Sequence, residues 1–540
     1  MHKQVIWIFG VVFLLSTTFL LLACNPAAYR ADADRESYCI IQQKSAGIEG
    51  MPAGFTIERQ ISHVDVPQID EATRVLTITE TLQIAVDHSR EHQSRREQVF
   101  LQALTLSMER HRFNPIYFGQ GNFTLNNDSF KKSIAGVFSF GFNQMLATGA
   151  DLSVDMSTNL FRIISGGNPG EIAASALSVR AVQPLLRGAG YLVTLENLTQ
   201  GERDMVYTIR DYVRYRREFS VEIINSYLSL LGQQDQVANA ESNLKSLDQQ
   251  REIVVNRVLA GLSSPIEADQ ATQQVLEARD SLLRAQASYE RVLDLFKIQL
   301  GIPTEVRILP KAEELQQITA RGIDKALIPP REGVKVALEN RLDLKNTRDR
   351  VEDYRRKVLV SEDLLKPGLD LILGYGADSD RPKAMLDFAD GEKDYTVGVD
   401  VELPLDRKAE RNTYRQSFIR LAAAERDLVD LRDRIAYEVR NAIRNVDLAV
   451  DRYQNQVKSL ELSRVRVERD SLLLQAGRAI TRDVLESQAD LLRAQNAVTS
   501  SIIDYYNAKL DLLLAMENME VDEHGFISEG KNYEWEYVDQ

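Results

Sequence analysis

The sequence predicts a mainly α-helical protein, built from a duplicated set of very long helices and two pairs of β-strands. Three observations lead to this fold class. About seventy residues, from Asp406 to Ala476, contain no Gly or Pro, and apolar residues recur within them at helical spacing. Short stretches of period-two alternation precede this segment and a similar one earlier in the chain. A compact single-core enzyme has no place for helices of this length.

The longest predicted helix follows from a ladder of apolar residues in steps of three and four. At 1.5 Å per residue it would be roughly 105 Å long, several times the width of a compact domain. Its apolar stripe needs an equally long partner, and the chain supplies one between Gly190 and Ala260. The ladder is Leu428, Leu431, Ile435, Val439, Ala442, Val446, Val450, Tyr453, Val457 and Leu460.

Composition favours one elongated helical body over several linked domains. No Pro/Gly/Ser-rich linker divides the 540 residues. The net charge of −14 argues against a nucleic-acid partner, because phosphate binding needs a basic surface. Acidity of this kind mainly supports solubility and would also suit a cation-tolerant lumen.

The N-terminus is interpreted as a lipoprotein signal peptide over residues 1–23. Lys3 precedes the apolar run 5–22, which ends in Leu21-Leu22-Ala23-Cys24. A small residue directly before a Cys resembles the bacterial lipobox, in which Cys24 would carry the lipid. Asn25, in place of an Asp, favours delivery to the outer membrane. The alternative is a transmembrane anchor with an incidental Cys.

The remaining boundaries follow the order of the patterns. An extended N-terminal arm is expected over 24–75, a first repeat over 76–302, a connector over 303–332, a second repeat over 333–518 and a tail over 519–540. The first repeat opens with a helix of about thirty-five residues that begins with a Thr77…Glu80 capping box, and the second with a helix over about 333–365. The long helices are placed at about 187–260 and 405–476.

Each repeat contains two strands with one apolar and one polar face. They are placed at about 149–184, around a Gly-rich loop at 166–170, and at about 368–404. An earlier run, 134–142, also alternates, and whether residues 130–145 join the same sheet stays open. Local matches support the duplication: Gln183-Pro184-Leu185 with Leu403-Pro404-Leu405, and Leu-Leu-Arg-Ala-Gln at 282–286 and at 491–495.

Over roughly residues 75–518 the sequence resembles the TolC family of outer-membrane efflux proteins. The resemblance rests on the duplicated strand-to-helix junctions (179–188 and 397–405), on the helix opening Ala337-Leu338-Glu339-Asn340-Arg341-Leu342-Asp343-Leu344, and on Gly477 followed by Asp483-Val484-Leu485. Each motif is weak by itself. Their repetition in the right order, together with a lipobox, identifies the family.

The resemblance implies a homotrimer with a TolC-like α-barrel of long helices and one shared twelve-stranded transmembrane β-barrel, to which each chain gives four strands. Alternation over about ten residues agrees with such strands; a small soluble sheet is the alternative. Expected to face the barrel lumen are Ser153, Asp155, Ser178, Arg180, Thr396, Asp400 and Glu402. Expected to face lipid or neighbouring side chains are Leu152, Val154, Leu177, Val179, Leu369, Leu371, Val397, Val399 and Val401.

No catalytic constellation and no cofactor site is predicted. His88 and His92 have the i, i+4 spacing that can bind zinc, but a third ligand and the metalloprotease order are missing, so no metal site is expected. The charged residues of the long helices are interpreted as solvated faces. Nothing resembles a phosphate-binding loop, so transport energy would come from a partner.

The two predicted hairpins supply the remaining candidate sites. Family resemblance places a carboxylate of the periplasmic aperture at Glu486, with Asp483 nearby and Arg478 and Arg482 as cationic partners. The pattern departs from the family at the tyrosine and arginine of its best-known closure, which fall on Leu474 and Ala479 here. Six residues are predicted to form adaptor-docking tips, because a Gly permits the helix reversal and its neighbours are small or apolar: Gly261, Leu262, Ser263, Gly477, Ala479 and Ile480.

The sequence therefore predicts a passive, lipid-anchored exit duct of the outer membrane that extends into the periplasm. Its expected partners are outer-membrane lipid, a periplasmic adaptor (membrane fusion protein) and an inner-membrane pump of RND, ABC or MFS type, in an efflux or type I secretion system. Drug, metal and protein cargo stay open. The alternatives are a lipid-anchored coiled-coil scaffold without a pore and, third, an enzyme.

Overall fold

The computed structural model describes residues 25–52, 54–58, 73–127, 132–165, 171–320, 322–326, 328–379, 388, 391–522 and 524–529. The signal peptide, Cys24, the loop at 166–170 and the end of the C-terminal tail lie outside these residues. Contacts divide the chain into two units. The first combines residues 1–48, 98–209 and 346–428, and the second combines 49–97, 210–345 and 429–540. Each unit therefore takes segments from both predicted repeats.

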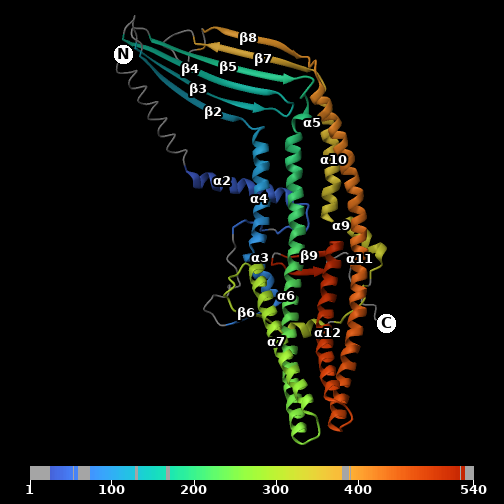
Figure 1. The fold of residues 1–540 in the computed structure, drawn as a ribbon. Helices are drawn as coiled ribbons and strands as arrows, with labels where there is room; N and C mark the ends of the chain where they lie inside the picture. Colours follow the sequence, from blue (N-terminus) through green and yellow to red (C-terminus); the bar gives the residue numbers. More distant parts are fainter. Residues whose placement is uncertain are drawn as a thin grey trace. The chain divides into compact units, whose positions relative to one another are not determined.

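Helices make up most of the regular structure of the chain, and the first unit also holds a large sheet (Figure 1). Two helices, α6 and α11, coincide with the long helices of the sequence prediction. No helix among the described residues has an apolar segment long enough to cross a bilayer. The helices are α2 (Pro26–Ser45), α3 (Ile78–His88), α4 (Arg90–His111), α5 (Tyr191–Thr194), α6 (Glu196–Leu259), α7 (Pro265–Leu300), α8 (Glu313–Ala320), α9 (Pro330–Asn340), α10 (Leu342–Asp363), α11 (Lys408–Gln475) and α12 (Thr481–Met516).

One six-stranded antiparallel sheet belongs to the first unit, in the order β2-β3-β4-β5-β7-β8. Four of its strands occupy the predicted stretches: β4 (Asp151–Ser165), β5 (Glu171–Pro184), β7 (Gly368–Asp378) and β8 (Lys393–Glu402). The other two, β2 (Ile116–Asn127) and β3 (Lys132–Met145), form a hairpin beyond β4. The sheet of this chain therefore has six strands, two more than the four expected, and residues 132–145, whose place was left open, pair with β4. Gly119 and Gly121 interrupt the apolar alternation of β2, which is why the sequence pattern missed it.

The N-terminal arm contains a helix, contrary to the extended conformation expected there. Asn25 caps α2 by accepting a hydrogen bond from the Ala27 backbone N–H (3.2 Å), and Pro26 occupies the first turn. Ile40 and Ile41 are buried, and the ring of Tyr38 packs on that of Phe100 at 5.3 Å. Because only the C-terminal part of α2 packs against the body, the sequence shows no apolar periodicity.

Both predicted helices of about thirty-five residues are broken into two. α3 gives way to α4 at Ser89 (ψ 127°), and α9 gives way to α10 at Arg341 (ψ 120°). At the first break, Gly301, which ends α7 at φ +77°, lies so close that a Cβ there would be 2.1 Å from the His88 carbonyl oxygen. At the second break the residue that ends α12 is Glu517, at φ 53°. The breaks thus lie where another helix ends against them.

The core of the second unit is formed by α3, α6 and α7 together with two short strands. β1 (Arg74–Leu76) pairs in parallel with β6 (Ile308–Pro310) in the predicted connector. Tyr227 of α6 is fully buried, and its hydroxyl donates to the Glu314 carboxylate at 2.6 Å. Two further short strands, β9 (Met519–Val521) and β10 (Ile527–Glu529), pair beyond α12.

Candidate functional site

The seven residues predicted to face a lumen lie on one face of the six-stranded sheet. Directly opposed residues in an antiparallel pair share a face, and the register pairs Ser153 with Arg180 and Asp155 with Ser178. On the other strand pair, Asp400 lies opposite Asp370, while Thr396 and Glu402 lie opposite glycines. This polar face also carries Gln120, Asn122, Ser139 and Asn143 of the hairpin.

The opposite face of the sheet is mainly apolar on all six strands, with polar exceptions such as Gln144, Thr158 and Ser175. Val397, Val399 and Val401 of β8 remain exposed in the single chain, as do Phe140 of β3 and Tyr117 of β2. A contiguous exposed apolar surface of this kind requires an apolar neighbour. The apolar side chains of this face are Tyr117, Phe123, Leu125, Ile134, Phe138, Phe140, Phe142, Leu152, Val154, Met156, Leu160, Leu177, Val179, Leu369, Leu371, Leu373, Tyr375, Tyr395, Val397, Val399 and Val401.

The two predicted tips are helix reversals of the same type in the second unit. Gly261 (φ +73°) follows α6, and the Leu262 N–H donates to the Arg257 carbonyl at 2.8 Å. Gly477 (φ +69°) follows α11, and the Arg478 N–H donates to the Leu473 carbonyl at 2.8 Å. This bond from beyond a left-handed residue back to the last turn is the Schellman motif, and it explains both glycines.

A hydrogen bond that the sequence did not predict joins the two tips. The Thr481 hydroxyl at the start of α12 donates to the Glu267 carboxylate at the start of α7, at 2.6 Å. This bond is the main reason that the pKa of Glu267 lies below its usual range. Leu262 is 68% exposed and Ile480 is 55% exposed. The tips therefore present apolar side chains to solvent on two reversals that a hydrogen bond joins.

The predicted aperture residues are brought together only in part. Glu486 pairs with Arg466 of α11 at 3.6 Å, and Arg466 also binds Asp490 at 2.6 Å and Asp470 at 3.5 Å. Asp483 accepts a hydrogen bond from the Ile480 N–H at 3.3 Å, which is the position of a helix cap. Arg482 and Glu486 line a groove between α7 and α12, with Gln270, Gln273, Gln274, Glu277, Leu485 and Ala489. Arg466, rather than Arg478 or Arg482, is thus the partner of Glu486.

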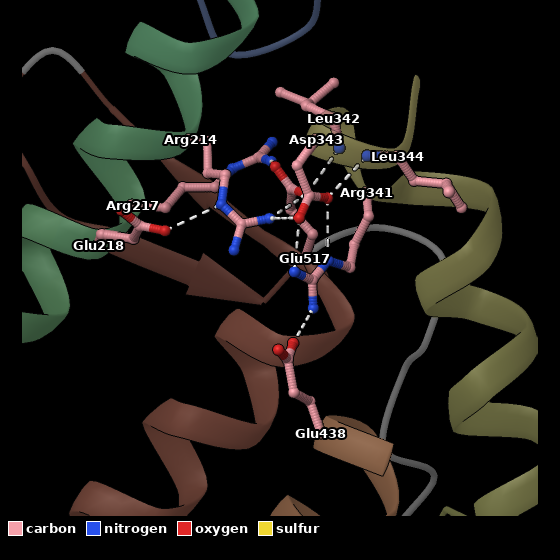
Figure 2. Close-up of polar contacts among 9 residues, drawn as sticks. All are labelled: Arg214, Arg217, Glu218, Arg341, Leu342, Asp343, Leu344, Glu438 and Glu517. Atoms are coloured by element: carbon pink, nitrogen blue, oxygen red, sulfur yellow. Dashed lines mark hydrogen bonds and ion pairs between the residues drawn. The ribbon is translucent and has the colours of Figure 1, made fainter. Parts of the chain in front are cut away.

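A buried ionic cluster at the α9–α10 break was not predicted as a site (Figure 2). Glu517, whose side chain is 1% exposed, accepts hydrogen bonds from Arg217 (2.7 Å) and from the Leu342 backbone N–H (2.8 Å). Arg341 forms a two-pronged pair with Asp343 at 3.0 and 2.6 Å. Arg214 binds Asp343 at 2.9 Å, and Glu438 of α11 binds Arg341. We call Arg214, Arg217, Arg341, Asp343, Glu438 and Glu517 the ionic cluster.

The ionic cluster connects four elements of the second unit: α6, the α9–α10 break, α11 and the end of α12. Burial raises the pKa of Glu517, although Arg217 and Arg214 favour its charged form. Burial acts in the same direction on Asp343, but hydrogen bonds from Arg341 and the charge of Arg214 outweigh it and lower the pKa. The only sequence signal was the Arg341-Leu342-Asp343 motif, which does not reveal partners in distant segments.

His88 and His92 do not share a helix, because the chain breaks between them at Ser89. His92 is buried, and its ring stacks on that of Phe219 at 5.2 Å. Among the residues that the structure describes, no group of three or more His, Cys, Asp or Glu side chains could hold a metal ion. His92 is therefore a packed core residue.

We expect His92 to make the protein less stable as the pH is lowered from about 6.5 to about 4. Burial, followed by the charges of Arg96 and Arg216, lowers its pKa from 6.5 to about 4. A depressed pKa means that the unfolded chain binds the proton first, so stability present above pH 6.5 is lost as the pH falls, by about 3 kcal/mol. Thermal unfolding of His92→Phe should depend less on pH in this window, whereas His111→Gln, at an exposed position, should behave as wild type. Equal slopes for wild type and His92→Phe would contradict the assignment.

The comparisons with known proteins concern both sequence and fold. A family model described as outer membrane efflux protein matches residues 191–294 and 333–516, more than half of the chain. No curated protein sequence matches it.

Solved structures match over most of their length. A structure of CusC, from work on its folding and transmembrane channel formation, has a TM-score of 0.62 at 13% identity and covers 85% of this chain and 98% of that one. The outer membrane protein VceC of Vibrio cholerae has a TM-score of 0.60 at 15% identity, and the match covers 81% of this chain and 95% of VceC. The CmeC outer membrane channel of Campylobacter jejuni has a TM-score of 0.60 at 13% identity, and the match covers 89% of this chain and 94% of CmeC. At these identities the likeness is one of fold.

Proposed function

The chain belongs to the outer membrane efflux protein family, and from this premise we propose that it is a passive exit duct of a tripartite efflux or type I secretion system. Such a duct would carry small molecules or polypeptides from an inner-membrane pump across the periplasm and the outer membrane. The observation that carries the proposal is the two-faced sheet, since an apolar face toward lipid and a polar face toward water are what a barrel wall requires.

The duct is proposed to be a homotrimer. A single sheet of six strands leaves two edges whose backbone groups have no partner in the sheet, and a bilayer offers no water to satisfy them. Closure with further copies removes both edges. The number of three copies comes from the family resemblance.

The proposed partners are a periplasmic adaptor and an inner-membrane pump. The tips at Gly261 and Gly477 support adaptor docking, because Leu262 and Ile480 offer exposed apolar side chains at hydrogen-bonded helix reversals. The sequence carries no phosphate-binding loop, which fits a duct that takes its energy from the pump.

The rival function is a lipid-anchored coiled-coil scaffold, which the long helices alone would permit. The purified full-length protein should form heat-labile trimers on gels and conduct ions in planar bilayers. A scaffold would give no conductance. The strand residues provide a matched test, because Asp155→Lys on the polar face should change ion selectivity while Val179→Leu on the apolar face should not.

We expect Glu486→Ala with Asp483→Ala to raise single-channel conductance. One exposed ion pair such as Arg466–Glu486 contributes at most about 1 kcal/mol, so closure depends on repetition in each copy of the trimer. Arg466→Ala should also raise the conductance, because it removes the other partner of the Arg466–Glu486 ion pair. Asp280→Ala, which breaks a surface pair within α7, serves as the control. Unchanged conductance in the double variant would rule out the gate.

Cys24 is proposed to carry the lipid, and this expectation rests on the sequence. Cys24→Ser should leave the protein uncleaved and without label from a fatty-acid probe, whereas Cys39→Ser should be processed and labelled as usual. Several acyl chains bind a membrane stably, so the anchor would supplement the barrel. Normal processing of Cys24→Ser would refute lipidation.

A further inference from the structure

We propose that the β2–β3 hairpin is part of the barrel wall, and that β8 of one copy pairs with β2 of the next. Three copies would then close an eighteen-stranded barrel, wider than the twelve-stranded one that four strands per chain would give. The inference rests on the proposed trimeric duct and concerns its wall and the width of its lumen.

The hairpin continues the sheet without a gap. β2 has 12 residues and pairs with β3 along its whole length. β3 has 14 residues and pairs with β4, with one register shift between Lys132 and Ser133 at the loop end. A transmembrane strand needs about 9–11 residues, so both strands are long enough to cross a bilayer.

The two faces of the sheet extend through the hairpin in register. Phe142 and Phe140 of β3 lie opposite Val154 and Met156 on the apolar face, and Tyr117 of β2 lies opposite Phe142. On the polar face, Asn143 lies opposite Ser153 and Ser139 opposite Ser157. A hairpin standing in water beyond the membrane would gain nothing from gathering five of its six aromatic rings on one face; the sixth, Phe118, lies on the polar face opposite Gly141.

Aromatic rings also cover the glycines that weaken β2 and β3. Gly121 lies opposite Phe138 and Gly136 opposite Phe123, and a Cβ at either glycine would be 3.3 Å from the opposing ring. The rings of Phe123 and Phe138 meet edge to face at 4.9 Å. This packing of aromatic residues over cross-strand glycines stabilises strands that would otherwise pair poorly.

Strand direction permits closure between copies. Every neighbouring pair in the sheet is antiparallel. With six strands, the edge strands β2 and β8 run in opposite directions, so rotation about a barrel axis brings β8 of one copy antiparallel to β2 of the next. Direct pairing of β8 with β4 of the next copy, as four strands per chain would require, is blocked because β3 occupies that edge of β4.

A larger number of strands would widen the lumen of the barrel. Barrel diameter grows roughly in proportion to strand number, and barrels of 16–18 strands enclose an aqueous channel. An eighteen-stranded wall would be about one and a half times as wide as a twelve-stranded one. The proposed duct would therefore admit bulkier hydrophilic cargo.

Disulfide crosslinking between copies tests the inference. In a Cys39→Ser background, Val399→Cys on β8 is combined in turn with Gly119→Cys, Gly121→Cys and Phe123→Cys on β2, so that three registers across the interface are sampled. The comparison variant combines Val399→Cys with Val154→Cys on β4, and each single-cysteine variant is a control. After copper-phenanthroline oxidation in isolated outer membranes, covalent oligomers are separated on heated non-reducing gels.

We expect at least one β2–β8 combination to form covalent trimers and the β4–β8 combination to form none. Trimers of the β4–β8 combination without any of the β2–β8 combinations, in samples that show the non-covalent trimer on unheated gels, would overturn the eighteen-stranded wall and leave the proposed duct intact. Absence of the non-covalent trimer from unheated gels of the unoxidised protein would refute the proposed duct, and this inference with it. Liposome swelling with sugars of increasing size gives a second readout, because the wider lumen should admit sugars that a twelve-stranded channel excludes.

Discussion

Replacing Leu262 and Ile480 by Asp together should abolish export while leaving the assembled protein in the outer membrane. Both side chains are mostly exposed, so the charges cost little folding stability. An apolar anchor at a contact contributes about 2 kcal/mol or more, and the change is repeated at every tip of the oligomer. Export of a pump substrate and crosslinking to the adaptor in whole cells are the measurements, and both should fall to background.

The matched control is Leu262→Met with Ile480→Val, which keeps the apolar surface and should export normally. Oligomer content on gels must equal wild type in both double variants, because the proposed barrel contacts lie in the other unit. Full export and crosslinking by the aspartate variant would show that docking occurs elsewhere.

Glu517→Ala should destabilise the helical body by about 3–5 kcal/mol, because it leaves the buried Arg217 and the Leu342 N–H without their acceptor. Glu517 also has φ 53°, a conformation that costs a non-glycine residue roughly 1–2 kcal/mol, and the carboxylate contacts offset this cost. Glu517→Gly removes the backbone strain and should be less destabilising than Glu517→Ala by about 1 kcal/mol. Thermal and denaturant unfolding of the purified oligomer measure both changes.

Glu438→Ala is the control from the same ionic cluster. Glu438 is about half exposed, and its partner Arg341 keeps the two-pronged pair with Asp343, so we expect a loss of only about 1 kcal/mol. An unfolding temperature of Glu517→Ala equal to that of wild type would mean that the break at Arg341 is held without the carboxylate.

The comparison between the two helix breaks explains why Glu517 is needed. At the first break the end of α7 is Gly301, and the His88 carbonyl approaches so closely that no side chain fits. At the second break there is room, and a carboxylate fills it and caps the Leu342 N–H. One duplicated junction is therefore closed by backbone contact and the other by an ionic cluster.

The sequence by itself determined those features whose cause is local. An uninterrupted apolar ladder specifies α11, period-two alternation specifies β4, β5, β7 and β8, and the tip glycines follow from the left-handed residue that ends a helix. That Asp155 and Arg180 lie on one face of the sheet follows from the two-residue period of the strands alone. The family resemblance added what these patterns could not, namely the outer-membrane exit duct.

The tertiary structure decided those features that depend on partners far away in the chain. Leu342 and Arg217 meet Glu517 across 175 and 300 residues, and no periodicity announces such contacts. The breaks at Ser89 and Arg341 occur because other helices end against them, in stretches whose own sequence suits a continuous helix. β2 and β3 join the sheet because β4 offers an edge in the right register, and that edge exists only once the sheet has formed.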